Sequence, residues 1–222
     1  MAAARKSTVF RVTGLPADQP DDALEAALTA VINDSLSEEE RSGIEAHPAV
    51  VPCCYDGERQ RVALVDFRGG VPKFLSELVV NPLGDWQIEM GDTDISFDCH
   101  FFGFTQLYKP RLEDQVTAEY VAFPYASSIP IFYLFLANSS RYSIIAITGL
   151  DGHAYGSWRG KGNLGRMWLR DFLSKDLPNC RTMTYGYNSK LSTHGIDTIM
   201  DYGRELMEEL KKVRNTEEVS PV

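Results

Sequence analysis

Metal-binding, secretion and phosphate-binding patterns are missing from this sequence of 222 residues. Its four cysteines form no CxxC pair and no two-Cys, two-His pattern, which argues against a structural zinc site. The start, MAAARKSTVF, lacks the apolar core of a signal peptide, so we expect a cytoplasmic protein whose thiols stay reduced. No G-x-x-x-x-G-K-[ST] sequence is present, which excludes the usual phosphate loop. We therefore expect neither a metal nor a cofactor.

Basic charge is scarce in the first half of the chain. Residues 1–110 hold 9 Lys and Arg against 18 Asp and Glu, whereas the remainder is balanced, so the net charge of −9 belongs to the first half. A surface of this kind repels a phosphate backbone, which argues against general nucleic-acid binding.

Strand and helix patterns alternate through residues 8–108. Runs of β-branched and aromatic residues alternate with apolar residues at the i, i+3, i+4 spacing of one helix face. Gly91-Asp92 lies between two alternating runs and predicts a hairpin, while Pro52 places its strand at a sheet edge. We interpret this segment as one α+β module. The expected elements are strands at 8–13, 49–55, 61–67, 86–90 and 95–99, and helices that begin near Asp21 and Pro72.

The order β-α-β-β-α-β is that of the ferredoxin-like fold, which RNA-recognition motifs (RRMs) also use. RNA-binding members stack bases on aromatic residues of the two central strands. In this sequence Arg11, Val62 and Leu64 occupy positions of the stacking aromatics. Phe67 is the aromatic residue that remains, and a phenylalanine there is equally a core residue. We therefore expect an RRM-like module that contacts protein or is structural, and RNA binding stays as an alternative.

Residues 121–137 form a conspicuous run without charge. A membrane helix needs about 20 apolar residues, and two prolines and two serines interrupt this stretch, so we do not expect a membrane anchor. Two other interpretations stay open: a linker or packed insert between modules, or unspliced sequence within the gene. We assign residues 109–142 to this linker or insert.

Two strand–helix units follow in residues 143–214, with a tail at 215–222. Ser143-Ile-Ile-Ala-Ile-Thr148 is typical of a strand buried on both faces, and residues 181–187 predict a second strand. Successive strand–helix units predict parallel strands joined by right-handed crossovers. The fold class is thus α+β followed by an incomplete parallel α/β sheet. The helix between the strands carries Leu164, Met167, Trp168 and Phe172. The last helix has one apolar face, formed by Ile196, Ile199, Met200, Gly203, Leu206, Met207, Leu210 and Val213.

A family resemblance lies in this second half. The runs IIAITGLDGHAYGSW, WLRDFLSKDLP and CRTMTYGYNSKLS resemble the N-terminal half of fungal lipase- and serine-esterase-like α/β-hydrolases, the type found in front of nucleotide-binding or repeat domains. The resemblance implies that the loop after the first strand supplies a backbone N–H to an oxyanion hole. Gly149, Leu150 and Asp151 stand at that loop, so the amide of Leu150 or Asp151 is the expected donor. A plain strand-to-helix turn is the alternative interpretation.

The catalytic residues that this resemblance implies are missing from the sequence. The family's G-x-S-x-G elbow follows the next strand, and no such pattern is present. Ser157 and Ser189 lack the flanking glycines, and His153 and His194 precede the expected nucleophile, which makes them loop residues. We expect a serine-hydrolase-like chain truncated before its nucleophile and non-catalytic by itself. One alternative is an esterase or lipase completed by a missing C-terminal half, and another is a protein- or RNA-binding RRM-like module. The expected kind of partner is another protein domain that completes the sheet.

Overall fold

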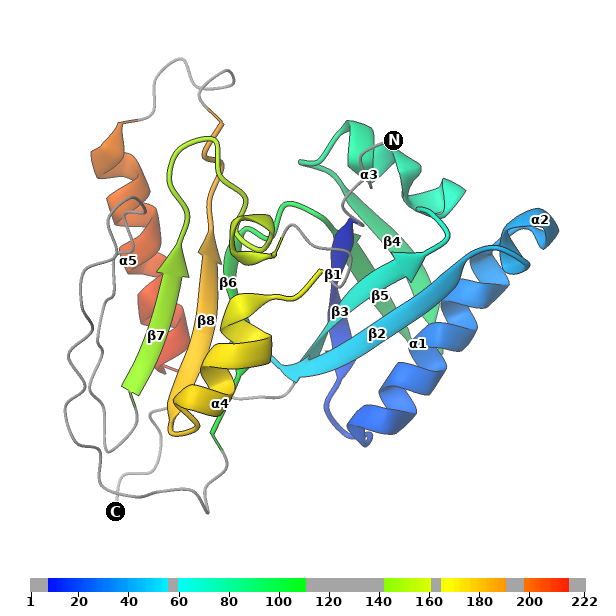
Figure 1. Cartoon of the computed structure of the whole chain (residues 1–222), viewed down its shortest axis with the longest axis horizontal. Helices are drawn as coiled ribbons and strands as arrows, with labels where there is room; N and C mark the ends of the chain where they lie inside the picture. The colour runs from blue at the N-terminus through cyan, green and yellow to red at the C-terminus, as the bar shows by residue number, and fades with distance from the viewer. Residues whose placement is uncertain (1–7, 56–59, 111–141, 161–164, 191–197, 216–222) are drawn as a thin grey trace. The chain divides into compact units, whose positions relative to one another are not determined.

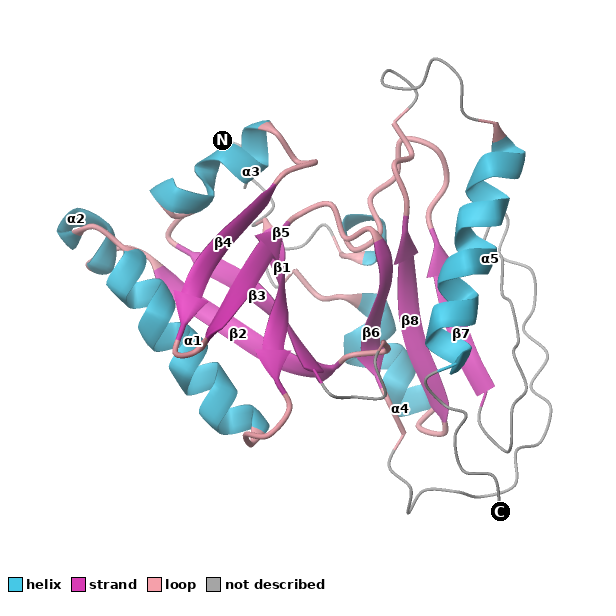
Figure 2. Cartoon of the chain, turned by 180° about the vertical axis from the view of Figure 1, so that it is seen from behind, coloured by secondary structure: helices cyan, strands magenta, loops and turns pink. Residues whose placement is uncertain are grey.

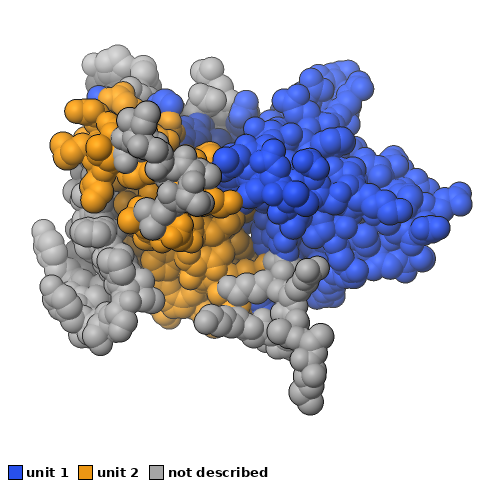
Figure 3. All heavy atoms as spheres, turned by 90° about the horizontal axis from the view of Figure 1, so that it is seen from above, with its two compact units in different colours: residues 1–100, 161–165, 211–222 blue, residues 101–160, 166–210 orange. Residues whose placement is uncertain are grey.

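The chain forms two compact units, which are described here separately (Figure 1, Figure 3). The first contains the chain up to His100, and the second contains most of the chain from Phe101 onward. Each unit combines a sheet with helices, so the expected mixture of α and β structure is confirmed. The computed structural model describes residues 8–55, 60–110, 142–160, 165–190 and 198–215.

The first unit is built on a five-stranded antiparallel sheet with the order β2-β3-β1-β5-β4 (Figure 2). β2 lies at one edge, as Pro52 predicted, and β4 and β5 form the predicted hairpin around Gly91. The strands are β1 (Val9–Pro16), β2 (Glu45–Pro52), β3 (Gln60–Arg68), β4 (Asp85–Met90) and β5 (Thr93–Asp98). The helices are α1 (Asp21–Ser35), α2 (Glu38–Arg41) and α3 (Ser76–Val80), with a 3-10 turn at Lys73–Leu75 before α3.

The core of the first unit lies between its sheet and its helices. Leu24, Leu28 and Ile32 recur on one face of α1 and are fully buried, as their helical spacing predicts. They belong to one cluster with alternate residues of the strands, so the residues between those lie on the opposite face of the sheet. The strand members of this cluster include Phe10 and Val12 of β1, Ala63, Val65 and Phe67 of β3, and Ile95 and Phe97 of β5.

β1 continues through the glycine at which the sequence pattern predicts its end. The pairing register between β1 and β3 shifts between Val12 and Leu15, and Gly14 has a φ of 87°. A Cβ atom at this position would lie 2.7 Å from the carbonyl oxygen of Asp94. Gly14 therefore makes a bulge inside the strand, where the local sequence indicates only a turn.

The second unit is built on a three-stranded sheet with the order β6-β8-β7. Its strands are β6 (Gly103–Tyr108), β7 (Tyr142–Ile147) and β8 (Cys180–Gly186). β7 and β8 are parallel, as expected, whereas β6 is antiparallel to β8. The sequence pattern places residues 103–108 in the first module, but in the structure they pair with β8 and so belong to the second sheet. Because this partner strand lies far along the chain, no local pattern reveals the pairing.

Helices cover both faces of the second sheet in Figures 1 and 2. On one face lies α4 (Ser174–Asp176), preceded by a π-helical turn at Leu169–Leu173, and on the other lies α5 (Ile199–Asn215). Met167 is buried, but Trp168 and Phe172 are 41% and 46% exposed. Leu169 and Leu173, which are four residues apart, are buried in the core instead.

The apolar face expected for α5 is only partly correct. Leu210 and Val213 are buried, whereas Ile199, Met200 and Met207 are exposed. Tyr202 of the same helix contacts Tyr187, with 5.0 Å between the ring centroids. This ring contact comes from a distant segment, so the apolar spacing of the helix does not predict it.

Several of the sequence predictions concern segments outside the described residues. Most of the expected linker 109–142, including the uncharged run 121–137, and most of the tail 215–222 lie there. Among the helices of the described residues, none is long and apolar enough to cross a membrane. All four cysteines are described, and none of them is in a disulfide.

Candidate functional site

The predicted oxyanion loop lies directly after β7. Gly149 and Leu150 follow the strand, and Leu150 is 51% exposed. Asp151 has a φ of 56°, in the left-handed region that non-glycine residues rarely adopt. Its backbone N–H donates to the carbonyl oxygen of Ser189 at 2.8 Å. This amide is therefore used within the fold, which leaves the Leu150 amide as the candidate donor.

Three hydrogen bonds tie this loop to the loop that follows β8. Besides the Asp151 amide, the Ser189 hydroxyl donates to the carbonyl oxygen of Gly152 at 2.7 Å. The Tyr187 hydroxyl donates to the carbonyl oxygen of Thr148 at 3.1 Å. These bonds hold together the carboxyl ends of the two parallel strands, which is the end of a parallel sheet where ligands bind. The loop pair is thus the place in the second unit where chemistry is expected.

The imidazole of His153 is used inside the same loop. Its Nδ1 accepts from the backbone N–H of Tyr155 at 3.1 Å and from that of Gly156 at 2.9 Å. Nδ1 therefore carries no proton, and the neutral ring has its proton on Nε2. The backbone N–H of His153 donates to the Ser157 hydroxyl at 3.0 Å. His153 and Ser157 shape the loop, as expected for His153, while His194 lies outside the described residues.

Buried polar side chains in the second sheet were not singled out from the sequence. Arg181 Nε donates to Gln106 Oε1, and both residues are more than nine-tenths buried. Tyr185, four residues further along β8 than Arg181 and on the same face, is 1% exposed. Burial, with a contribution from the charges of Glu205 and Glu209, raises the pKa of its hydroxyl well above the usual range. The alternation of polar residues in RTMTYGY is the sequence signal that could have found this group.

Other buried polar atoms of the second unit lack a hydrogen-bond partner among the described residues. Native proteins satisfy nearly all such atoms, so each one marks either a water site or a place where a ligand group could bond. Two of them, Trp158 Nε1 and Asn188 Oδ1, belong to the segments that follow β7 and β8. The full set in this unit is Gln106 Nε2, Trp158 Nε1, Thr182 Oγ1, Thr184 Oγ1, Tyr185 Oη and Asn188 Oδ1.

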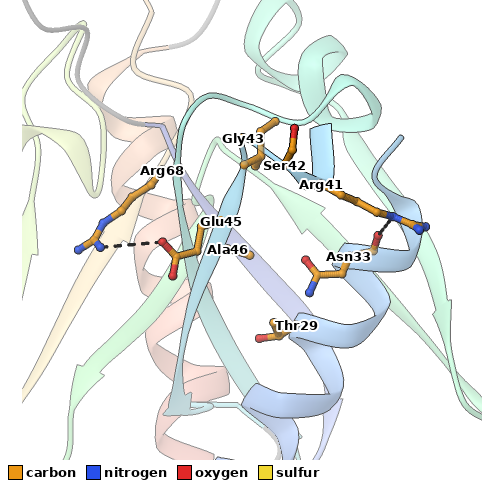
Figure 4. Close-up of a pocket in the computed structure, with 9 residues that line it drawn as sticks. Thr29, Asn33, Arg41, Ser42, Gly43, Glu45, Ala46 and Arg68 are labelled. Atoms are coloured by element: carbon orange, nitrogen blue, oxygen red, sulfur yellow. Dashed lines mark hydrogen bonds and ion pairs between the residues drawn. The ribbon is translucent and has the colours of Figure 1, made fainter. Parts of the chain in front are cut away.

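A hollow of about 480 Å³ opens on the first unit beside the end of α1 (Figure 4). Arg41 Nε donates to the carbonyl oxygen of Asn33 at 3.1 Å, so it satisfies the C-terminal end of the helix. Arg68 lies 4.0 Å from Glu45, and Figure 4 shows this pair pointing away from Arg41. Because both arginines have protein partners, we interpret the hollow as a helix–strand junction. Its lining is Thr29, Asn33, Arg41, Ser42, Gly43, Ile44, Glu45, Ala46 and Arg68.

Asp85, Asp98 and His100 are the described side chains whose ligand atoms come close enough together to hold a metal ion. His100 Nε2 lies 3.4 Å from Asp85 Oδ1, and its Nδ1 lies 3.4 Å from Asp98 Oδ1. Arg11 Nε donates to Asp98 Oδ2 at 2.7 Å. The permanent positive charge of Arg11 opposes a cation beside Asp98, and the two ring nitrogens face different carboxylates. The group is better described as an ion-pair network than as a metal centre.

No protein-family model, curated protein or solved structure matches this chain. Its function is therefore inferred from its own fold and contacts.

Proposed function

We propose that this chain is a serine-hydrolase-like protein that acts by binding rather than by catalysis. The observation that carries this proposal is the hydrogen bond from the Asp151 amide to the Ser189 carbonyl oxygen. An oxyanion hole needs amides that point at a reacting oxygen, and this amide is already bonded within the fold. The proposal concerns the loop pair that follows β7 and β8.

The serines of the loop pair support a structural role. Ser189 donates to the carbonyl oxygen of Gly152 and is 3% exposed, and Ser157 accepts from the backbone N–H of His153. A serine nucleophile needs a base that can take its proton. His153 Nδ1 instead accepts from two backbone amides of its own loop, so it is not directed at either hydroxyl. These contacts favour a structural role for the loop, because its polar side chains bond to the backbone and are not arranged for catalysis.

We further propose that the first unit is a ferredoxin-like module extended by one strand. The part β2-β3-β1-β5 of its sheet, with α1 and α3 between strands, fits the β-α-β-β-α-β plan, and β4 is added beside β5. Arg11 and Leu64 are cross-strand partners on the face away from the core cluster. RNA-binding relatives of this fold carry aromatic rings there, so protein contact is favoured over RNA binding.

Labelling with a fluorophosphonate probe and turnover of p-nitrophenyl butyrate test the non-catalytic role. The purified full-length chain is expected to show no labelling and no turnover above a heat-denatured sample. Labelling that disappears in Ser157→Ala or Ser189→Ala, but persists in Ser35→Ala on exposed α1, would contradict the proposal.

A further inference from the structure

An exposed apolar patch lies where α3 leads into β4 (Figure 1). Val79, Val80, Leu83 and Trp86 are 48%, 80%, 42% and 40% exposed, although they fall close together in the sequence. The segment is anchored, because the neighbouring Leu78 is buried in the core cluster. Single exposed apolar side chains are ordinary, but four within eight residues of the chain, one of them a tryptophan, are typical of a contact surface.

β4 offers backbone hydrogen-bonding groups beside this patch. Among the described strands it pairs with β5 alone, and it forms the outer edge of the first sheet. An antiparallel edge strand directs the N–H and C=O groups of alternate residues away from its one partner. Asp85, Trp86, Gln87 and Glu89 are exposed along it. Such an edge can accept an extended peptide as an additional strand.

Acidic residues predominate in the chain around the patch, with Lys73 as an exposed basic residue just before α3. Residues 74–108 contain six Asp and Glu but no Lys or Arg. Glu77, Asp85, Glu89 and Asp92 are exposed on α3, on β4 and at the turn after β4. This distribution attracts a positively charged partner and repels an anionic one.

The same charges disfavour a second copy of this chain as the occupant. If two β4 strands paired antiparallel about Gln87, Asp85 of each copy would face Glu89 of the other, and like charges directly opposite are destabilising. Charged residues by themselves protect an edge from aggregation. Protection from aggregation does not explain why the apolar side chains Trp86 and Val80 are exposed beside this edge.

We propose that the edge of β4 binds an extended protein segment rich in lysine or arginine by strand addition, with apolar residues of that segment against Trp86 and Val80. The backbone of the segment pairs with β4, and its basic side chains meet Glu77, Glu89 and Asp92. This inference rests on the protein-contact role proposed for the first unit and not on the hydrolase resemblance, so detection of esterase activity would leave it standing.

A pair of short synthetic peptides tests the proposal. One alternates valine and lysine, and the other has glutamate in place of lysine. In amide NMR spectra of the full chain, the lysine peptide is expected to shift the signals of residues 79–90, with an affinity that falls as salt rises. The glutamate peptide is expected to leave them unchanged. Equal binding of both peptides, or shifts confined to other parts of the chain, would overturn the proposal.

Variants distinguish binding at the patch from nonspecific binding to exposed apolar side chains elsewhere on the protein. Val80→Asp and Trp86→Ser are each expected to weaken binding of the lysine peptide roughly tenfold. Met200→Asp is the matched control, because Met200 is an exposed apolar residue of α5, and it is expected to bind as the parent chain does. Val80 is 80% exposed, so its replacement should leave the melting temperature unchanged. Unaltered binding in both patch variants would refute the site. Concentration-dependent shifts of residues 85–90 without peptide would identify a second copy as the occupant and equally overturn it.

Discussion

Asp151, in the loop after β7, donates its backbone N–H to the carbonyl oxygen of Ser189, in the loop after β8, at 2.8 Å. The Ser189 hydroxyl in turn donates to the carbonyl oxygen of Gly152, the residue after Asp151, at 2.7 Å. Asp151 keeps a φ of 56° in this arrangement. A residue held in a sparsely populated backbone region costs about 1–3 kcal/mol and persists only where surrounding contacts require it. The loop after β7 is therefore shaped by its bonds to the loop after β8.

Removal of the Ser189 hydroxyl should weaken the attachment of the loop after β7 to the loop after β8, because it removes one of the hydrogen bonds between them. Ser189→Ala leaves the carbonyl oxygen of Gly152 without the hydroxyl, and we expect a loss of about 1 kcal/mol in the free energy of unfolding, measured with urea. Ser35→Ala is the matched control, because the Ser35 hydroxyl donates to the carbonyl oxygen of Val31 at an exposed position of α1. Equal losses in both variants would show that the hydrogen bond from Ser189 to Gly152 does not stabilise the fold.

Two glycines should respond to alanine in opposite directions. At Gly186 a Cβ atom would overlap the carbonyl oxygen of Phe101, so Gly186→Ala should destabilise the protein by about 1–3 kcal/mol. Gly203 lies within α5 and has open space around its Cβ position, so Gly203→Ala should stabilise it by about 0.5–1 kcal/mol. Thermal unfolding measures both changes, and a Gly186→Ala protein as stable as the parent would contradict the close approach.

The Arg11–Asp98 pair should behave as a buried ion pair. Both residues are more than nine-tenths buried, with Nε 2.7 Å from Oδ2. Asp98→Ala leaves the Arg11 charge without this partner and should cost about 3–5 kcal/mol, whereas the double variant Arg11→Met/Asp98→Leu should recover most of the loss. Arg204→Ala removes an exposed pair with Asp201 and should change stability by less than about 1 kcal/mol. A double variant no more stable than Asp98→Ala would argue against charge burial as the cause.

Alkaline pH should destabilise the second unit through Tyr185. Burial first, and then Glu205 and Glu209, raise the pKa of its hydroxyl above the ordinary value of 10.0. The folded state therefore holds this proton more tightly than the unfolded state does. The contribution of the protonated Tyr185 hydroxyl to the free energy of unfolding is therefore full below pH 10. It is lost as the pH rises above 10, because the unfolded state then releases the proton more readily than the folded state. Tyr185→Phe should flatten the fall in unfolding free energy above pH 10, measured by urea titrations at several pH values. If the unfolding free energy of the parent protein and of Tyr185→Phe fell equally above pH 10, Tyr185 would not be the cause of the alkaline destabilisation.

The second sheet should depend on β6. In a fragment of residues 143–222, β8 lacks the ladder that joins it to β6 between Gly103 and Tyr108. We expect hydrogen exchange to show strong protection of the β8 amides in a fragment of residues 101–222 and weak protection in the shorter one. The first 100 residues should unfold cooperatively by themselves. Equal protection of β8 in both fragments would show that β6 does not stabilise the sheet.

Local patterns in the sequence were enough for many single elements. The spacing of Leu24, Leu28 and Ile32 predicted the buried face of α1, because helical periodicity is a property of the segment itself. Gly91 marked the turn between β4 and β5 for the same reason. The β-branched run before Thr148 predicted a buried strand that pairs in parallel with the next one.

Tertiary structure decided what depends on distant partners. Residues 103–108 join the second sheet because their backbone pairs with β8, and nothing within those residues specifies that partner. The ring of Tyr202 on α5 contacts that of Tyr187, which follows β8, and the sequence of the helix does not specify this partner. Likewise, the sequence predicted the Asp151 amide as a possible oxyanion-hole donor, but its bond to Ser189 depends on how two separate loops meet. Periodicity and turn residues are local properties, whereas strand pairing, helix rotation and the use of a backbone amide are set by residues far away in the chain.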